Sequence, residues 1–176
     1  ATPSGARVRH VKGSHIVVPR VHDEEHAYIL QNSDNRIVFV IPYQERWSLI
    51  GTTDVPVDEY DAPRISDDET DYLIALANAY LEKPISRADV VWSYSGVRPL
   101  YDDGTSDPSA VTRDYVLKLD TLEGAPGTER APVLSIYGGK ITTYRKLAEA
   151  ALSELAPYFP GMKSGWTASE TLPGGD

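Results

Sequence analysis

The sequence reads Ser135-Ile-Tyr-Gly-Gly-Lys-Ile-Thr-Thr-Tyr-Arg-Lys-Leu147 where an apolar run passes into an amphipathic segment. The apolar run, residues 133–137, predicts a β-strand, and apolar residues spaced by three and four from Tyr144 onward predict a helix. Between them lie Gly138 and Gly139, which permit a sharp turn and the close approach of another molecule, because glycine has no Cβ atom. The free N–H groups at the start of a helix attract an anionic or electron-rich group. A glycine pair also joins strand to helix where no ligand binds, so this stretch alone leaves both interpretations open.

Most of the chain before this stretch has the pattern of β-strands separated by short turns. The pattern predicts strands over residues 7–20, 27–31, 36–41, 47–52, 90–101 and 112–119. The first is either one strand interrupted near Gly13 or two short strands, and the unbroken apolar run 36–41 predicts burial on both faces. Short turns between the early strands favour an antiparallel meander.

Two helices complete the pattern. Ser66 and Glu69 match a capping box, which predicts a helix that begins there and continues to about Glu82. The second helix follows the glycine pair and ends near Pro157. Because strands and helices do not alternate one by one, we predict an α+β fold with an antiparallel or mixed sheet and two main helices. The chain has no Gly-x-Gly-x-x-Gly motif after a strand, and therefore no dinucleotide-binding fingerprint of its own.

The composition narrows the possible partners. Acidic side chains outnumber basic ones and give a formal charge of −9, which argues against nucleic acid as the main partner. The chain has no cysteine, which excludes disulfides, thiolate metal sites and a cysteine nucleophile. No apolar run approaches the roughly 18 residues that span a bilayer, and no signal peptide is visible. We expect an excised piece of a longer protein, because the chain begins without Met and ends on a stretch that closes no element.

Three side chains have the chemistry of a ligand site. Arg98 follows an apolar strand in a segment made rigid by glycine and proline, which suits a guanidinium that binds phosphate or carboxylate, although a structural ion pair is as reasonable. Arg113 has Asp114 beside it, which favours the ion pair more strongly. His15 lies at the entry to a buried strand and could take a proton from a substrate hydroxyl, but a lone histidine is more often structural. No spacing of histidines or carboxylates indicates a metal site.

Six motifs follow one another along the chain: Lys12-Gly-Ser-His-Ile-Val-Val-Pro-Arg20, Ile50-Gly-Thr-Thr-Asp54, Tyr94-Ser-Gly-Val-Arg-Pro-Leu100, Thr112-Arg-Asp-Tyr115, Gly138-Gly-Lys-Ile-Thr-Thr-Tyr-Arg-Lys-Leu147 and Leu172-Pro-Gly-Gly-Asp176. Several motifs in a fixed order are far more specific than any one of them. Together they cover nearly the whole chain, and it resembles the middle part of FAD-dependent glycerol-3-phosphate dehydrogenase, the quinone-linked aerobic enzyme.

The resemblance implies a fold like that of D-amino-acid oxidase, with a Rossmann-like flavin domain and a substrate domain on a mixed or antiparallel sheet. It implies that residues 1–101 are part of the substrate domain. Residues 102–159 would form a strand hairpin and the flavin-edge helix, the last strand–helix piece of the FAD domain. Residues 160–176 would be a linker toward a C-terminal domain.

The resemblance also implies a reaction and roles for residues. Glycerol 3-phosphate becomes dihydroxyacetone phosphate by hydride transfer from C2 to FAD, and the electrons pass to a membrane quinone. Arg98 would hold the substrate and favour the oxyanion developing at C2, with Lys140 close to flavin and substrate. His15 would be the catalytic base or a substrate-orienting group, and Arg113 a weaker candidate for a phosphate contact. The flavin edge would meet a short run of residues, namely Gly138, Gly139, Lys140, Ile141 and Thr142.

The missing dinucleotide motif limits what the chain is expected to do alone. We expect the isolated fragment to be soluble, inactive and at best a weak binder of FAD. The parent is expected to be a homodimer, peripheral on the cytoplasmic side of the inner membrane. Two alternatives stay open: an oxidase that passes electrons from glycerol 3-phosphate to oxygen, and a non-catalytic binding module of the same fold. A nicotinamide-dependent dehydrogenase is a third alternative, but no motif here resembles that family.

Overall fold

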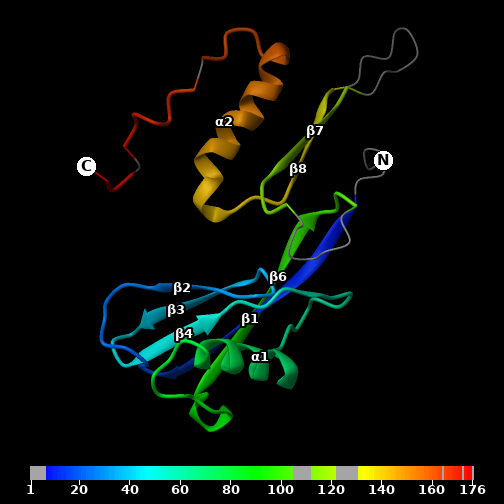
Figure 1. Cartoon of the computed structure of the whole chain (residues 1–176). Helices are drawn as coiled ribbons and strands as arrows, with labels where there is room; N and C mark the ends of the chain where they lie inside the picture. Colours follow the sequence, from blue (N-terminus) through cyan, green and yellow to red (C-terminus); the bar gives the residue numbers. More distant parts are fainter. Residues whose placement is uncertain (1–6, 105–111, 122–130, 164, 172, 176) are drawn as a thin grey trace. The chain divides into compact units, whose positions relative to one another are not determined.

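The computed structural model describes residues 7–104, 112–121, 131–163, 165–171 and 173–175, and these divide into two compact units (Figure 1). We call the unit formed by Arg9–Pro99 the sheet unit. The hairpin–helix unit comprises Ala1–Val8, Leu100–Gly104 and Val111–Asp176.

A 6-stranded sheet forms the frame of the sheet unit. Its strands are β1 (Val8–Pro19), β2 (Tyr28–Gln31), β3 (Ile37–Tyr43), β4 (Trp47–Gly51), β5 (Val55–Pro56) and β6 (Trp92–Tyr101). The order is β2-β3-β4-β1-β5, and β6 also pairs with β1. The consecutive strands β2, β3 and β4 pair antiparallel and form the predicted meander. The first predicted strand is continuous, because β1 passes through Gly13 without a break.

Helix α1 (Asp67–Asn78) covers one face of this sheet (Figure 1). Its Leu73 and Ala77 are fully buried and pack in one cluster with side chains of the sheet: Ile16, Val18, Leu30, Val38, Val40 and Ile50. The predicted helix extends too far, because α1 ends at Asn78 rather than near Glu82. The Asn78 side chain donates to the backbone oxygen of Ile85 and accepts from its N–H, both at 2.8 Å, and so fixes the chain where it leaves the helix.

Among the described residues of the sheet unit, no helix covers the opposite face of the sheet, and we call this face the open face. In β3, Ile37 and Phe39 are 46% and 36% exposed, while Val38 and Val40, which alternate with them, are buried. The prediction that residues 36–41 are buried on both faces is therefore wrong. Cross-strand register places Phe39 and His15 opposite Gly51, so the open face also carries His15.

In the hairpin–helix unit, β7 (Val116–Asp120) and β8 (Val133–Tyr137) pair antiparallel. The predicted strand over residues 112–119 begins only at Val116. A 3₁₀ turn, η2 (Ile141–Thr143), separates the glycine pair from α2 (Tyr144–Leu155), and η3 (Ala156–Tyr158) follows α2. None of the residues of α2 is buried, so its predicted apolar stripe is not part of a core in this chain.

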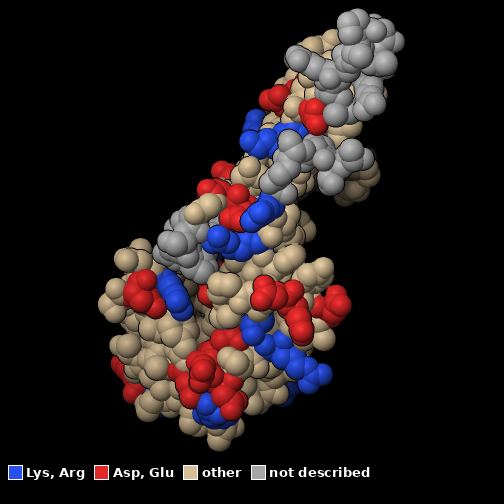
Figure 2. All heavy atoms as spheres, turned by 90° about the vertical axis from the view of Figure 1, so that its right-hand side faces the viewer, with Lys and Arg blue, Asp and Glu red and all other residues tan. Residues whose placement is uncertain are grey.

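Charged side chains of both signs are interspersed on the face drawn in Figure 2. On this face, the described residues do not form a continuous basic surface of the kind that binds nucleic acid. Among the described residues, no helix is both long enough and apolar enough to cross a bilayer.

Candidate functional site

Arg98 lies on the open face near the end of β6, and its guanidinium contacts two residues that follow β4. Nη1 donates to the Asp54 carboxylate at 3.3 Å, and Nη2 donates to the Thr52 hydroxyl at 3.2 Å. The side chain of Arg98 is 32% exposed, whereas that of Asp54 is 12% exposed. A guanidinium has five N–H donors, and these contacts use two of them. The fold therefore fixes the position of the cation and leaves donors for an anionic oxygen.

Gly13 on β1 makes room for this arginine. A Cβ atom at Gly13 would lie 2.4 Å from Nη1 and 2.5 Å from Nη2 of Arg98, and 2.6 Å from the Thr52 hydroxyl. These separations are too short for any non-bonded contact, so the guanidinium can lie across β1 only because residue 13 has no side chain.

His15 lies two residues further along β1, between neighbours on two other strands. The ring stacks on Tyr94 of β6, with a centroid distance of 4.8 Å and an interplanar angle of 3°. On the other side, a Cβ atom at Gly51 of β4 would lie 2.2 Å from Cδ2 of His15. Burial lowers the pKa of His15 below its ordinary value, and the positive charge of Arg98 lowers it further. The structure thus brings His15 and Arg98 together on the open face.

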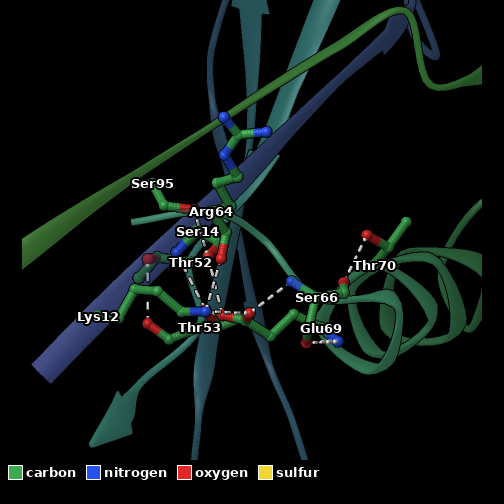
Figure 3. A network of polar contacts seen from close by, with 9 residues as sticks. All are labelled: Lys12, Ser14, Thr52, Thr53, Arg64, Ser66, Glu69, Thr70 and Ser95. Carbon is green, nitrogen blue, oxygen red and sulfur yellow. Dashed lines mark hydrogen bonds and ion pairs between the residues drawn. The ribbon is translucent and has the colours of Figure 1, made fainter. Parts of the chain in front are cut away.

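A buried polar network on the opposite side of β1 fixes the same stretch of strand (Figure 3). The Glu69 carboxylate accepts from Ser14 at 2.8 Å and from Thr53 at 2.6 Å, and it pairs with Lys12 at 2.7 Å. Glu69 also completes the predicted capping box, because its side chain accepts from the Ser66 N–H and its own N–H donates to the Ser66 hydroxyl. Since Lys12 and Ser14 flank Gly13, the network ties the start of α1 to the strand that carries the candidate site.

Glu69 is ionised over most of the pH range because of these contacts. Burial alone would raise its pKa, but the contact with Lys12 and hydrogen bonds from Thr53, Ser66 and Ser14 outweigh burial and lower the pKa to about 2. The folded pKa thus lies below the ordinary value of 4.5, so the stabilisation is complete above about pH 5 and disappears as the pH falls toward 2.

We predict that Glu69→Gln lowers the free energy of unfolding at pH 7 by about 3 kcal/mol, because it removes the charged partner of Lys12, whose side chain is only 12% exposed. Urea unfolding at pH 7 and pH 3 measures the effect, and the deficit of the variant should shrink at pH 3. Glu59→Gln is the matched control, since Glu59 is an exposed carboxylate. If the variant loses the same free energy of unfolding at pH 7 and at pH 3, Glu69 does not stabilise the fold through its ionised carboxylate.

The predicted flavin-edge residues lie in the hairpin–helix unit. Gly138 and Gly139 have φ values of 68° and 99°, a region that glycine enters without strain. Two hydrogen bonds fix the backbone of η2. The Thr143 hydroxyl donates to the backbone oxygen of Lys140 at 2.9 Å, and the Thr143 N–H donates to the same oxygen at 3.0 Å. Lys140, Ile141 and Thr142 are exposed, and Ile141 is 89% exposed. The predicted helix after the glycine pair is confirmed, and α2 begins at Tyr144, after the 3₁₀ turn η2.

Arg113 lies just before β7, in the same unit as the glycine pair. A Cβ atom at Gly138 would lie 3.2 Å from the backbone oxygen of Asp114, so the segment that carries Arg113 runs beside the glycine turn. The predicted site residues therefore form two groups, each within one unit. His15 and Arg98 belong to the sheet unit, and the second group comprises Arg113, Gly138, Gly139, Lys140, Ile141 and Thr142.

Sequence reasoning did not assign roles to the residues that position the first group. Gly13 and Gly51 leave space for Arg98 and His15, while Thr52 and Asp54 hold the guanidinium. Two signals were available: glycine inside a strand pattern marks close approach of another group, and Thr52 and Asp54 stand in a motif beside one of these glycines.

Other features of the sheet unit do not offer a better site. A cavity of about 610 Å³ lies between β2, β3 and the segment after α1, lined in part by Val21, Leu30 and Leu81, and it contains none of the predicted site residues. In the described part of the chain, no cluster of three or more histidines and carboxylates has the arrangement of a metal site.

Known proteins resemble this chain over nearly its whole length. A family model described as FAD dependent oxidoreductase matches residues 2–145. The aerobic glycerol-3-phosphate dehydrogenase of Escherichia coli (strain K12) is 52% identical over 174 residues, which are 98% of this chain and 34% of that protein. The D-erythritol 1-phosphate dehydrogenase of Brucella abortus (strain 2308) is 47% identical over 177 residues, 100% of this chain and 34% of that protein.

A solved structure has the same fold. It is the X-ray structure of the glycerol-3-phosphate dehydrogenase from Bacillus halodurans complexed with FAD, with a TM-score of 0.70 and 29% identity over 97% of this chain and 31% of that one. Together with the family match, it confirms the predicted fold class. The chain spans about a third of the length of the curated relatives it matches.

Proposed function

This chain belongs to the family of FAD-dependent oxidoreductases, and from that premise we propose that it is the middle part of an enzyme that oxidises sn-glycerol 3-phosphate to dihydroxyacetone phosphate. We call that longer protein the full-length enzyme. Support comes from a relative of that name that is 52% identical to 98% of this chain, while the chain corresponds to only 34% of the relative.

The observation that carries the proposal is the arrangement of Arg98. Its guanidinium is fixed by Asp54 and Thr52 on the open face, a third exposed, and keeps donors that no described residue occupies. A cation fixed in this way suits a substrate whose C2 oxygen gains negative charge as its hydroxyl proton leaves, because the cation needs no reorganisation at that moment. We assign to Arg98 the binding of the substrate and the stabilisation of that oxygen.

The glycine turn and η2 have the properties expected of a flavin-edge contact. Gly138 and Gly139 present backbone without a Cβ atom, and Ile141 and Thr142 begin a helical turn, where N–H groups lack partners within the turn. These residues fit the electron-rich pyrimidine edge of FAD, which when bound supplies the hydride acceptor. Lys140 adds a positive charge beside them and is assigned to flavin and substrate, and Arg113 to the substrate phosphate.

The remaining features of the full-length enzyme are proposed from the resemblance of the motifs. Electrons pass on to a quinone, the enzyme is a homodimer, and it lies peripherally on the cytoplasmic side of the inner membrane. An oxidase would instead reduce oxygen, and stoichiometric hydrogen peroxide in an aerobic assay would identify it.

The test of the substrate is a comparison of polyol phosphates. A second candidate substrate is D-erythritol 1-phosphate, because a dehydrogenase named for it is 47% identical to this chain. The full-length enzyme should reduce an artificial electron acceptor with a kcat/KM for glycerol 3-phosphate at least about tenfold above that for D-erythritol 1-phosphate. Unphosphorylated glycerol should be a much poorer substrate. A preference for D-erythritol 1-phosphate would replace the proposed substrate with the second candidate.

We predict that the isolated chain binds FAD weakly or not at all, because it contains no dinucleotide-binding fingerprint to hold the pyrophosphate. Titration of the purified chain with FAD, followed by flavin fluorescence, should give no saturation below about 1 μM. The full-length enzyme is the positive control. Sub-micromolar binding by the isolated chain would show that these residues hold more of the cofactor than proposed.

A further inference from the structure

The fold encloses one of the two ring nitrogens of His15. Nδ1 is buried and has no hydrogen-bond partner among the residues that the structure describes, whereas Nε2 is not enclosed in this way. The ring cannot easily turn over, because it stacks on Tyr94 at 4.8 Å and a Cβ atom at Gly51 would lie only 2.2 Å from Cδ2. Its two nitrogens therefore lie in different environments.

The charges that face His15 keep the ring neutral near pH 7. Burial and the cation of Arg98 both lower its pKa from 6.5, so the neutral form predominates at that pH. Tyr94, which stacks on the ring, has a pKa raised by burial and by Tyr43, and it also stays neutral. A neutral imidazole carries one proton, which resides on either Nδ1 or Nε2.

The two positions of that proton differ in free energy. On Nδ1, it would be a buried donor without an acceptor, an arrangement that folded proteins avoid. On Nε2, the donor points away from the enclosed side and can reach water or a ligand. Nδ1 then keeps only an unused lone pair, which is the less costly defect.

We infer that His15 carries its proton on Nε2 and donates it in a hydrogen bond to a substrate oxygen held by Arg98, rather than acting as the base that accepts the C2 hydroxyl proton. The inference rests on the proposed function in naming the acceptor, but the position of the proton follows from the fold alone. A base needs an unprotonated nitrogen that faces the substrate, and in this arrangement the unprotonated nitrogen faces the interior. His15 is then a donor at low and high pH alike, since protonation of Nδ1 gives the imidazolium cation but leaves the Nε2 donor in place.

The test combines a spectroscopic and a kinetic measurement on the full-length enzyme. Long-range ¹H–¹⁵N correlation spectra of protein labelled with ¹⁵N-histidine distinguish the two tautomers, and the signals absent from His15→Gln identify His15. We expect the tautomer with the proton on Nε2. The tautomer with the proton on Nδ1 overturns the inference whether or not any variant is active.

The kinetic measurement compares amide side chains that replace one nitrogen or the other. Glutamine places its amide near Nε2, asparagine near Nδ1, and alanine has no donor. His15→Gln should keep kcat/KM for glycerol 3-phosphate within about tenfold of the parent, while His15→Asn and His15→Ala lose about 100-fold. The pH dependence of kcat/KM should have the same shape in His15→Gln and the parent. If folded His15→Gln is as inactive as His15→Ala, or the ascending limb of the pH profile is lost, His15 is the base.

If glycerol 3-phosphate is not the substrate, the two measurements give a result that differs from failure of the His15 inference. In that case the parent enzyme itself oxidises no glycerol 3-phosphate, and the tautomer of His15 is still determined by the spectrum.

Discussion

Replacing Arg98 with alanine in the full-length enzyme is expected to lower kcat/KM for glycerol 3-phosphate about 1,000-fold and to leave the fold intact. The guanidinium is a third exposed, so its removal opens no cavity in the core. Its loss removes the fixed cation that stabilises charge at the substrate's C2 oxygen. Arg98→Lys should recover only part of the activity, because an ammonium cannot reproduce the planar fork that contacts Asp54 and Thr52.

Arg46→Ala is the matched control, since Arg46 is an exposed arginine of the same unit. Its activity should equal that of the parent. Circular dichroism and thermal unfolding of Arg98→Ala should match the parent to within a few degrees. Activity of Arg98→Ala within a few-fold of the parent would remove Arg98 from the site.

Gly13→Ala is expected to lower kcat/KM about 100-fold with little loss of stability. The added methyl group would lie 2.4 Å and 2.5 Å from the terminal nitrogens of Arg98. Those atoms are the far end of a flexible side chain that can move aside, and the Thr52 hydroxyl, 2.6 Å from the added methyl group, must rotate as well. Gly51→Ala differs, because its Cβ would lie 2.5 Å from Cγ of His15, close to the backbone, and should also destabilise the fold.

A double variant shows whether Gly13 acts through Arg98. If it does, Gly13→Ala combined with Arg98→Ala should be no less active than Arg98→Ala alone, since the displaced group is already absent. Fully additive losses would mean that Gly13 affects the reaction by another route.

Local sequence patterns predicted local structure well and long-range contacts poorly. Ser66 and Glu69 were recognised as a capping box because both partners lie within one turn, and the box is present. The same carboxylate also binds Thr53 and Ser14, 16 and 55 residues away, and these contacts arise only when β1, the segment after β4 and α1 are assembled. No local pattern in the sequence predicts these contacts, because the residues that make them are far apart along the chain.

The same limit applies to burial and to the candidate site. The apolar run 36–41 predicted a strand, which is confirmed, but one face of β3 is open because the described part of the sheet unit has a helix on one side of the sheet alone. Arg98 and His15 were recognised as candidates from residue type and motif. Gly13 and Gly51 were not, because the need for glycine there comes from side chains that neighbouring strands bring over them.

Anaerobic mixing of the full-length, FAD-loaded enzyme with glycerol 3-phosphate tests the central claim most directly. We expect the visible absorption of the oxidised flavin to disappear, with one dihydroxyacetone phosphate formed per flavin reduced, and the same change to be about 1,000-fold slower in Arg98→Ala. A flavin that stays oxidised with glycerol 3-phosphate but is reduced by dithionite would contradict the proposed oxidation of this substrate.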